Sequence, residues 1–255
     1  MMKRIISILL FTLLTAFASA QTYVCPPCNG PSCDTLTFTQ AGKCPHCGMQ
    51  LIKKNQDIKK LNVCFYLYDG IEVLDFAGPL EVFSYAGCNI SIVSKTTAPL
   101  HAQGVLKVLP TYSIENAPPA DIFVTFGGND EVASNDPEVI KWIQSRIPDT
   151  KYFMSVCTGA FILGKAGILD HKTVTTFHNS IENLRKALPN STVLADKRFV
   201  EDGNVLTTAG ISAGIDGALH LVEKLRGHDA AMQIAKQMEY DKWVPGEGLV
   251  VKTKD

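Results

Sequence analysis

From residue 61 onward, short apolar runs alternate with segments whose apolar residues recur at helical spacing. Four runs are rich in β-branched or aromatic residues and are bounded by turn-forming residues, as buried strands are: 61–67, 90–93, 121–126 and 152–156. The helical patterns cover 79–86, 137–146, 159–166, 181–188 and 213–226. Alternating strands and helices form parallel β-α-β units. We therefore predict an α/β domain over 61–255, with an open, mostly parallel sheet and helices on both faces.

Cysteine is distributed unevenly along the chain. Of eight cysteines in 255 residues, five lie between positions 25 and 47. A segment of about forty residues buries too little apolar surface to fold on hydrophobicity alone, so metal or disulfides must hold residues 21–52 together. The polar stretch 53–60 has no apolar periodicity and is typical of a linker. The sequence thus predicts a small cysteine-rich module joined to the α/β domain.

Two C-x2-C pairs separated by fifteen residues lie in the module: Cys25, Cys28, Cys44 and Cys47. This spacing brings four thiolates to one tetrahedral ion, and zinc is the predicted occupant. Cys33 and His46 are alternative ligands. Disulfide pairing is the competing interpretation in an oxidising compartment, although five cysteines cannot all pair among themselves.

Residues 1–20 have the composition of a secretory signal peptide. Lys3 and Arg4 precede an apolar stretch, 5–17, which ends in three small residues. The stretch is short for a membrane span, and an uncleaved anchor helix is the alternative. We expect cleavage after residue 20 and a periplasmic or secreted mature chain with no membrane association.

The charges are balanced, with 24 Lys and Arg against 25 Asp and Glu and no long basic run. Such a chain has no electrostatic attraction for nucleic acid or for an anionic membrane surface. A small-molecule substrate is the expected partner, and no nucleic acid is expected.

Cys157 stands between the predicted strand 152–156 and the predicted helix, with no loop residues between them. Ser155 and Gly159 are small, as the sharp turn of a nucleophile elbow requires. A helix amino terminus supplies unpaired N–H groups and a positive dipole end, which favour thiolate. A buried structural cysteine is the alternative. The pattern favours a nucleophile.

Two other strand ends carry candidate site residues. Asp75 lies among apolar neighbours, where it either works with Cys157 or caps a helix that begins near Gly78. Gly127 and Gly128 form a turn whose N–H groups are suited to an anion. The carboxyl ends of parallel strands meet at one edge of a sheet, where such sheets bind ligands.

Several segments, in this order, resemble the ThiJ/PfpI superfamily: EVLDFAGPLEVF around Asp75, Gly127-Gly128, SVCTGAFILGKAGILDHKTVTTF over 155–177, and TTAGISAGIDGALHLV over 207–222. The resemblance implies a flavodoxin-like, class I glutamine amidotransferase-like fold, without a cofactor and commonly as a homodimer. Within the superfamily, the chain is similar to the isonitrile hydratase branch and to the amino-terminal domains of AraC-type regulators.

The isonitrile hydratase pattern implies a nucleophile at Cys157, an acid/base carboxyl at Asp75 and an assisting role for Thr158. It also matches the backbone N–H groups of Gly128 and Thr158 to an anion-binding position. The implied enzyme is a carbon-nitrogen hydro-lyase that converts an isonitrile to an N-substituted formamide.

The sequence departs from the superfamily where proteases carry a histidine, because Phe177 stands there and His178 follows. On a strand, a shift of one residue turns the side chain to the other face. This argues against a Cys-His triad, and His178 reaches the site only if the strand ends at Thr176. The alternative functions are a redox or 2-oxoaldehyde activity at the same cysteine, or a non-enzymatic ligand- or metal-binding module.

Residues 23–26 and 42–51 resemble small heavy-metal-binding modules with a YxCP…GKCPxCGM pattern. Those modules usually carry Met-His after the first Cys-Pro, whereas this chain has Pro27-Cys28. The departure favours thiolate over imidazole as the ligand.

Overall fold

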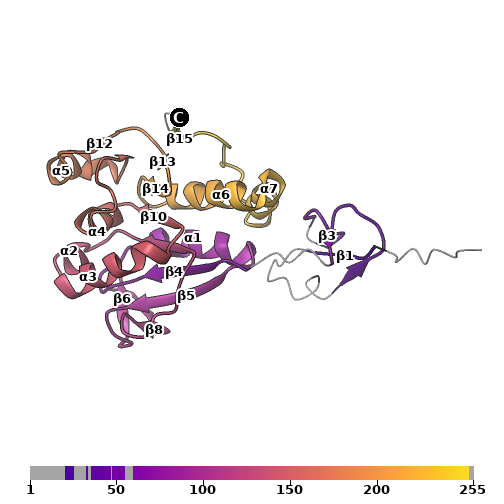
Figure 1. Ribbon diagram of the computed structural model, residues 1–255, viewed down its shortest axis with the longest axis horizontal. Helices are drawn as coiled ribbons and strands as arrows, with labels where there is room; N and C mark the ends of the chain where they lie inside the picture. The colour runs from indigo at the N-terminus through magenta and orange to yellow at the C-terminus, as the bar shows by residue number, and fades with distance from the viewer. Residues whose placement is uncertain (1–20, 26–32, 34–35, 47, 55–59, 253–255) are drawn as a thin grey trace, which may run out of the picture.

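The computed structural model describes residues 21–25, 33, 36–46, 48–54 and 60–252 (Figure 1). The predicted signal peptide, 1–20, lies outside these residues, as do Cys28 and Cys47 of the predicted metal site and part of the predicted linker. Within the described ranges, no helix is long and apolar enough to cross a membrane.

An eight-stranded sheet with the order β15-β13-β14-β10-β9-β4-β5-β8 forms the centre of the α/β domain. Every neighbouring pair is parallel except β13 with β14, so the predicted mostly parallel sheet is confirmed. The strands are β4 (Asn62–Tyr66), β5 (Asn89–Ser94), β8 (Tyr112–Ser113), β9 (Ile122–Thr125), β10 (Tyr152–Val156), β13 (Phe199–Asp202), β14 (Val205–Thr208) and β15 (Leu249–Val251).

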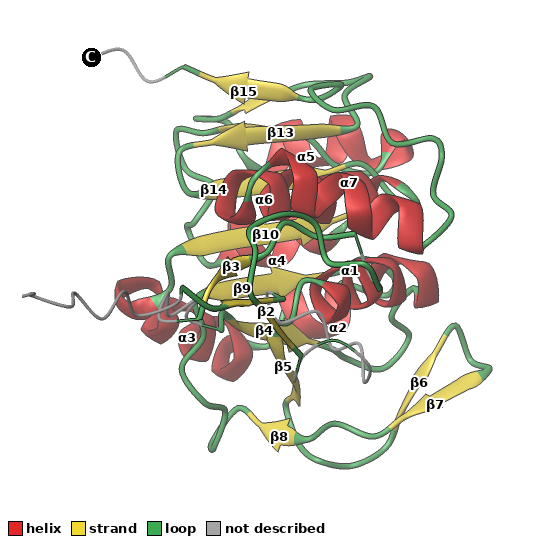
Figure 2. Ribbon diagram, turned by 90° about the vertical axis from the view of Figure 1, so that its right-hand side faces the viewer, coloured by secondary structure: helices red, strands yellow, loops and turns green. Residues whose placement is uncertain are grey.

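Helices cover both faces of this sheet (Figure 2). One group of mutually contacting helices contains α1 (Val73–Tyr85), α6 (Ala213–Arg226) and α7 (His228–Gln237). The other contains α2 (Glu131–Ser134), α3 (Pro137–Arg146), α4 (Gly159–Lys165) and α5 (Ile181–Ala187). Short 3-10 helices span Ile147–Asp149 and His178–Ser180. The hydrophobic core lies between the sheet and these two helical layers.

Three two-residue strands form a small antiparallel sheet in the cysteine-rich module, in the order β2-β1-β3. They are β1 (Tyr23–Val24), β2 (Thr37–Phe38) and β3 (Ile52–Lys53). A separate small core packs against them, consisting of Cys25, Cys33, Cys44, Met49 and Leu51. This core is mostly sulfur-containing side chains, in keeping with a module too small for an ordinary hydrophobic core.

Two minor strand pairs complete the α/β domain. A hairpin joins β6 (Leu100–Ala102) to β7 (Leu106–Val108), and β11 (Thr173–Val174) runs parallel to β12 (Thr192–Val193). The sequence did not indicate the hairpin, because its strands are short and largely exposed.

One predicted boundary is wrong. Helix α1 begins at Val73 rather than near Pro79, so Asp75 lies inside the helix and does not cap it. Proline inside a helix costs about 3 kcal/mol. Here α1 packs against α6 and β5 and buries Phe76 and Val82, which offsets that cost.

Candidate active site and metal centre

Cys157 occupies a sharp turn between β10 and α4. Its φ of 57° lies in the left-handed region, which residues other than glycine rarely adopt. The turn is held from two sides, because the Cys157 N–H donates to Ala209 O at 3.1 Å and the Thr176 hydroxyl donates to Cys157 O at 2.7 Å. The predicted elbow is therefore present, and the sulfur lies where β10 ends.

The small residues around the elbow have a steric reason. A Cβ at Gly159 would stand 2.7 Å from Phe126 N and from the Thr125 carbonyl, so no larger residue fits there. Ser155 is fully buried beneath the turn. The spacing that predicted the elbow thus reflects the close approach of β9 to the start of α4.

Asp75, in the first turn of α1, is fully buried and faces the elbow. Its Oδ1 accepts a hydrogen bond from the Ile211 N–H at 2.8 Å, and its Oδ2 accepts one from the Gly127 N–H at 2.9 Å. A Cβ at Gly127 would stand 2.8 Å from both Asp75 Oδ2 and Cys157 Sγ, so the carboxylate and the sulfur meet beside this glycine. Four distant parts of the chain converge here.

Burial raises the pKa of both members of the pair. Burial raises the pKa of Asp75 to about 6, and the N–H groups of Ile211 and Gly127 limit the rise. Burial, followed by the charge of Asp75, raises the pKa of the Cys157 thiol well above its usual range, although the Thr158 N–H opposes this. Desolvation and the neighbouring negative charge thus oppose the predicted thiolate more strongly than the helix terminus favours it.

The glycine turn and Thr158 contribute backbone groups around the sulfur. The Thr158 N–H points at the Cys157 sulfur. Gly128 has φ 121° and pairs with Ile71, and a Cβ there would stand 2.4 Å from Gly70 O. The Gly127 N–H is engaged by Asp75, which differs from its predicted role in anion binding.

The Phe177 ring lies beside the Cys157 sulfur, at the sequence position where a histidine would be needed for a Cys-His triad. A Cβ at Gly210 would stand 2.5 Å from Phe177 Cδ2 and 3.2 Å from Cys157 Sγ, so the ring and the sulfur are neighbours across this glycine. His178 begins the 3-10 helix, is exposed, and stacks against the Phe177 ring at 4.3 Å between ring centroids.

The sequence did not single out Ile211, Gly210 or Tyr68. Ile211 has φ 58°, which turns its N–H toward Asp75. Tyr68 is buried and its hydroxyl donates to Phe126 O at 2.7 Å, next to the glycine turn. Their position in the sequence could have identified these three residues, because each of them follows the carboxyl end of a strand of the sheet.

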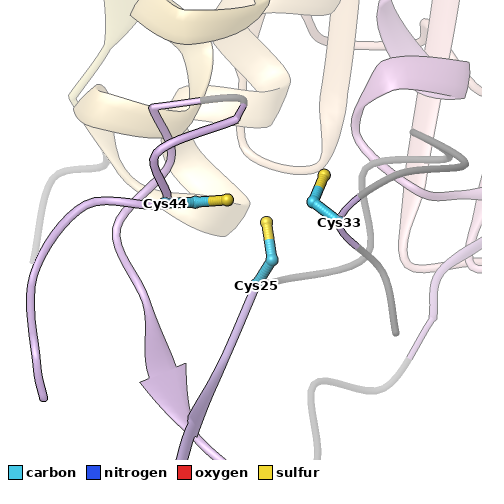
Figure 3. A group of neighbouring side chains, drawn as sticks. All are labelled: Cys25, Cys33 and Cys44. Carbon is cyan, nitrogen blue, oxygen red and sulfur yellow. The ribbon is translucent and has the colours of Figure 1, made fainter. Parts of the chain in front are cut away.

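The metal centre gathers three thiols. The sulfur atoms of Cys25, Cys33 and Cys44 all lie within 4.8 Å of one another, and the three residues are buried (Figure 3). Thiolates bound to one zinc ion at roughly 2.3 Å lie about 4 Å apart, so the three fit a single ion. Cys33, predicted only as an alternative ligand, belongs to this cluster, whereas His46 is exposed.

The turn that carries Cys44 has the form of a metal-binding knuckle. The Cys44 N–H donates to Met49 O at 2.7 Å, and the Gly48 N–H donates back to Cys44 O at 2.8 Å. Gly48 has φ 73°, a conformation that favours glycine. The chain thus turns tightly after Cys44, and Gly48 has the positive φ expected of a glycine in this position.

The model of the DJ-1/PfpI family matches residues 61–224, which include Asp75, Gly127, Cys157 and Ile211. The chain belongs to the DJ-1/PfpI family. A heavy metal binding domain model matches residues 22–54, which include the three-thiol cluster. The chain is thus a DJ-1/PfpI protein preceded by a heavy metal binding domain, as both resemblances predicted.

The proteins that resemble this chain have different functions. An isonitrile hydratase of Pseudomonas putida is 34% identical over 71% of this chain and 78% of its own. The HTH-type transcriptional regulator GbdR of Pseudomonas aeruginosa is 26% identical over 54% of this chain and 37% of the regulator. The crystal structure of a ThiJ/PfpI family protein from Pseudomonas syringae matches with a TM-score of 0.67 and 30% identity, covering 73% of this chain and 77% of that one. The similar proteins thus include an enzyme and a transcriptional regulator.

Proposed function

We propose that this DJ-1/PfpI protein is an exported isonitrile hydratase that forms N-substituted formamides. The observation that carries the proposal is the Asp75–Cys157 pair, in which a buried carboxylate and a thiol hold one proton between them. The similarity to the Pseudomonas putida isonitrile hydratase supports the choice of substrate. Proton transfer through Asp75 needs no imidazole at the sulfur.

In the first step, the Cys157 sulfur attacks the terminal carbon of the isonitrile. The S–H bond breaks, Asp75 accepts the proton, and Asp75 then delivers it to the same carbon. A C–S bond and a C–H bond form, which gives a thioimidate, R–N=CH–S–Cys. The N–H groups of Gly128 and Thr158 stabilise the negative charge that develops before protonation.

In the second step, water adds to the thioimidate carbon. Asp75 accepts a proton from the water as the C–O bond forms and passes it to the nitrogen. The C–S bond then breaks as the new hydroxyl becomes the carbonyl, and the hydroxyl proton passes through Asp75 to the Cys157 sulfur as R–NH–CHO leaves. The net reaction adds one water molecule and needs no oxidant or cofactor.

The test uses the purified chain from residue 21 with cyclohexyl isocyanide, and mass spectrometry detects N-cyclohexylformamide. We expect formation by the wild type and by a Cys88→Ala control, and loss in Cys157→Ala, with folding checked by circular dichroism. Absence of formamide, or undiminished formation by Cys157→Ala, would overturn the proposal. Conversion of methylglyoxal instead would favour the 2-oxoaldehyde activity.

For the heavy metal binding domain we propose zinc as the resident ion. Cys25, Cys33 and Cys44 supply three thiolates, and Cys28 and Cys47 are the candidates for the remaining ligand. Bound zinc supplies structural cross-linking, which a module of this size needs. Elemental analysis of the protein as purified should give one zinc per chain, and another metal at that stoichiometry would overturn the assignment.

We also propose that the chain is exported and cleaved after residue 20. The charge and apolar pattern of residues 1–20 supports this. Mass spectrometry of the periplasmic fraction from an expressing bacterium should give a mature chain beginning at Gln21. A cytoplasmic chain that begins at Met1 would contradict it.

A further inference from the structure

The proposed mechanism makes no use of Phe177, although its ring is a neighbour of the reacting sulfur. Both Phe177 Cδ2 and Cys157 Sγ lie within 3.2 Å of the point where a Gly210 Cβ would stand. Cys157 is 6% exposed, and Phe177 is partly exposed. The ring is thus a partly exposed neighbour of a nearly buried sulfur.

Hydrogen bonds hold the backbone immediately before Phe177. The Thr176 hydroxyl donates to Cys157 O at 2.7 Å, and the Thr175 N–H donates to Thr207 Oγ1 at 2.8 Å. Both threonines are buried. The backbone that carries the ring is thus tied to the elbow itself.

The two neighbours of the sulfur differ in polarity. Beside Gly127 lies the Asp75 carboxylate, and beside Gly210 lies the Phe177 ring. A substrate group that carries negative charge meets repulsion from Asp75 and loses hydration against the ring. A hydrocarbon group gains by covering the ring, because aromatic and apolar surfaces are removed from water together.

We propose that Phe177 is the specificity-determining residue of the Cys157 site, an apolar wall that selects a neutral electrophile carrying a hydrocarbon substituent. For isonitriles, which rests on the proposed function, the selected class is the alkyl and cycloalkyl isonitriles rather than those with a carboxylate. The selection itself is a property of the ring beside the sulfur and applies to any reagent that reaches Cys157.

The first test measures thiol alkylation and needs no turnover. Rates of Cys157 modification by N-cyclohexylmaleimide and N-methylmaleimide are followed by peptide mass spectrometry and divided by the same ratio for glutathione. We expect the wild type to favour the cyclohexyl reagent by about fivefold, the effect of one aromatic contact. Phe177→Ala should lose this preference, whereas Phe177→Leu and the matched control His178→Ala should keep most of it.

An unchanged ratio in Phe177→Ala would overturn the proposal, provided that its melting temperature shows a folded protein. Should Phe177→Ala not fold, Phe177→His takes its place, because it keeps a ring but makes it polar. Loss of preference in Phe177→His supports the apolar wall, and a retained preference overturns it.

The second test compares kcat/KM for cyclohexyl isocyanide and for isocyanoacetate. We expect the ratio to fall about fivefold or more in Phe177→Ala and to stay unchanged in His178→Ala. If the wild type makes no formamide, the proposed function fails, and the maleimide ratios alone decide the role of Phe177. If formamide forms but neither ratio responds to Phe177→Ala, the specificity proposal fails and the proposed function stands.

Discussion

Buried sulfur atoms in the two parts of this molecule have opposite neighbours. Cys25, Cys33 and Cys44 are surrounded by one another, whereas Cys157 lies against the carboxylate of Asp75. Thiols that face each other can release their protons to a shared cation. A thiol that faces a carboxylate in a desolvated site keeps its proton until a reactant arrives. Because all four sulfur atoms are buried, the neighbouring group distinguishes the chemistry of the two centres.

The two centres also lie at opposite ends of the sheet. Cys157 follows the carboxyl end of β10, and the module precedes the amino end of β4, which points away from β1 and β3 (Figure 1). Cys64 lies in a third environment, the core of the sheet. There, burial raises the pKa of its thiol to about 12. We expect changes at one centre to leave the other intact, and substitutions of Asp75 and Cys44 test that separation.

The largest effect is expected from Asp75→Asn. The amide cannot accept the Cys157 proton, so kcat/KM for isonitrile hydration should fall about a thousandfold, within the usual range for loss of a general acid or base. Zinc content should not change. Glu81→Gln, an exposed position on the same helix, is the matched control and should retain full activity. A loss below tenfold in Asp75→Asn would contradict the shared-proton mechanism.

Cys44→Ser should act on the other centre alone. Loss of one thiolate from the cluster should weaken zinc binding about a hundredfold or more, because each ligand carries a large share of the binding free energy. Competition with a chromophoric chelator measures the affinity, and Cys88→Ala is the control outside the cluster. Formamide production should persist in Cys44→Ser, and its loss would show that the two centres are coupled.

Gly127→Ala should destabilise the α/β domain. The new Cβ would stand 2.8 Å from Cys157 Sγ and from Asp75 Oδ2, both held in place by their surroundings. Overpacking of this kind lowers the free energy of unfolding by about 1–3 kcal/mol. Urea denaturation measures it, with Gly164→Ala as the control, where the Cβ meets only the end of Leu188 at 3.1 Å. Equal stability of the two variants would contradict the close packing at Gly127.

The smallest effect is the pH dependence. Because burial raises the pKa of Asp75 to about 6, the carboxylate becomes protonated as pH falls through this value and can no longer accept the thiol proton. We expect kcat/KM to fall about tenfold from its neutral plateau by pH 5, with the slope of a single proton. Zinc release should be steeper, since several thiolates take up protons. A flat rate between pH 5 and pH 7 would contradict the assignment.

Much of this architecture follows from local sequence. The strand 152–156 and the helices 137–146 and 213–226 are where their apolar patterns place them, because a continuous apolar run suits a strand buried on both faces and apolar residues at helical spacing suit a packed helix. The elbow at Cys157 follows from the small residues on either side. The start of α1 does not, because Pro79 suggests a helix beginning, and only packing against α6 and β5 extends the helix back to Val73.

The sequence by itself determined a sheet of parallel strands, a cysteine at a strand end and a module held by sulfur, since spacing and periodicity encode these features. Only the tertiary structure decided that Cys33 joins Cys25 and Cys44, that the Ile211 N–H reaches Asp75 across 136 positions, and that Phe177 flanks the sulfur. It also decided that the pKa of the Cys157 thiol is raised. That shift depends on desolvation and on a charge brought from another part of the chain, and neither exists before the chain has folded.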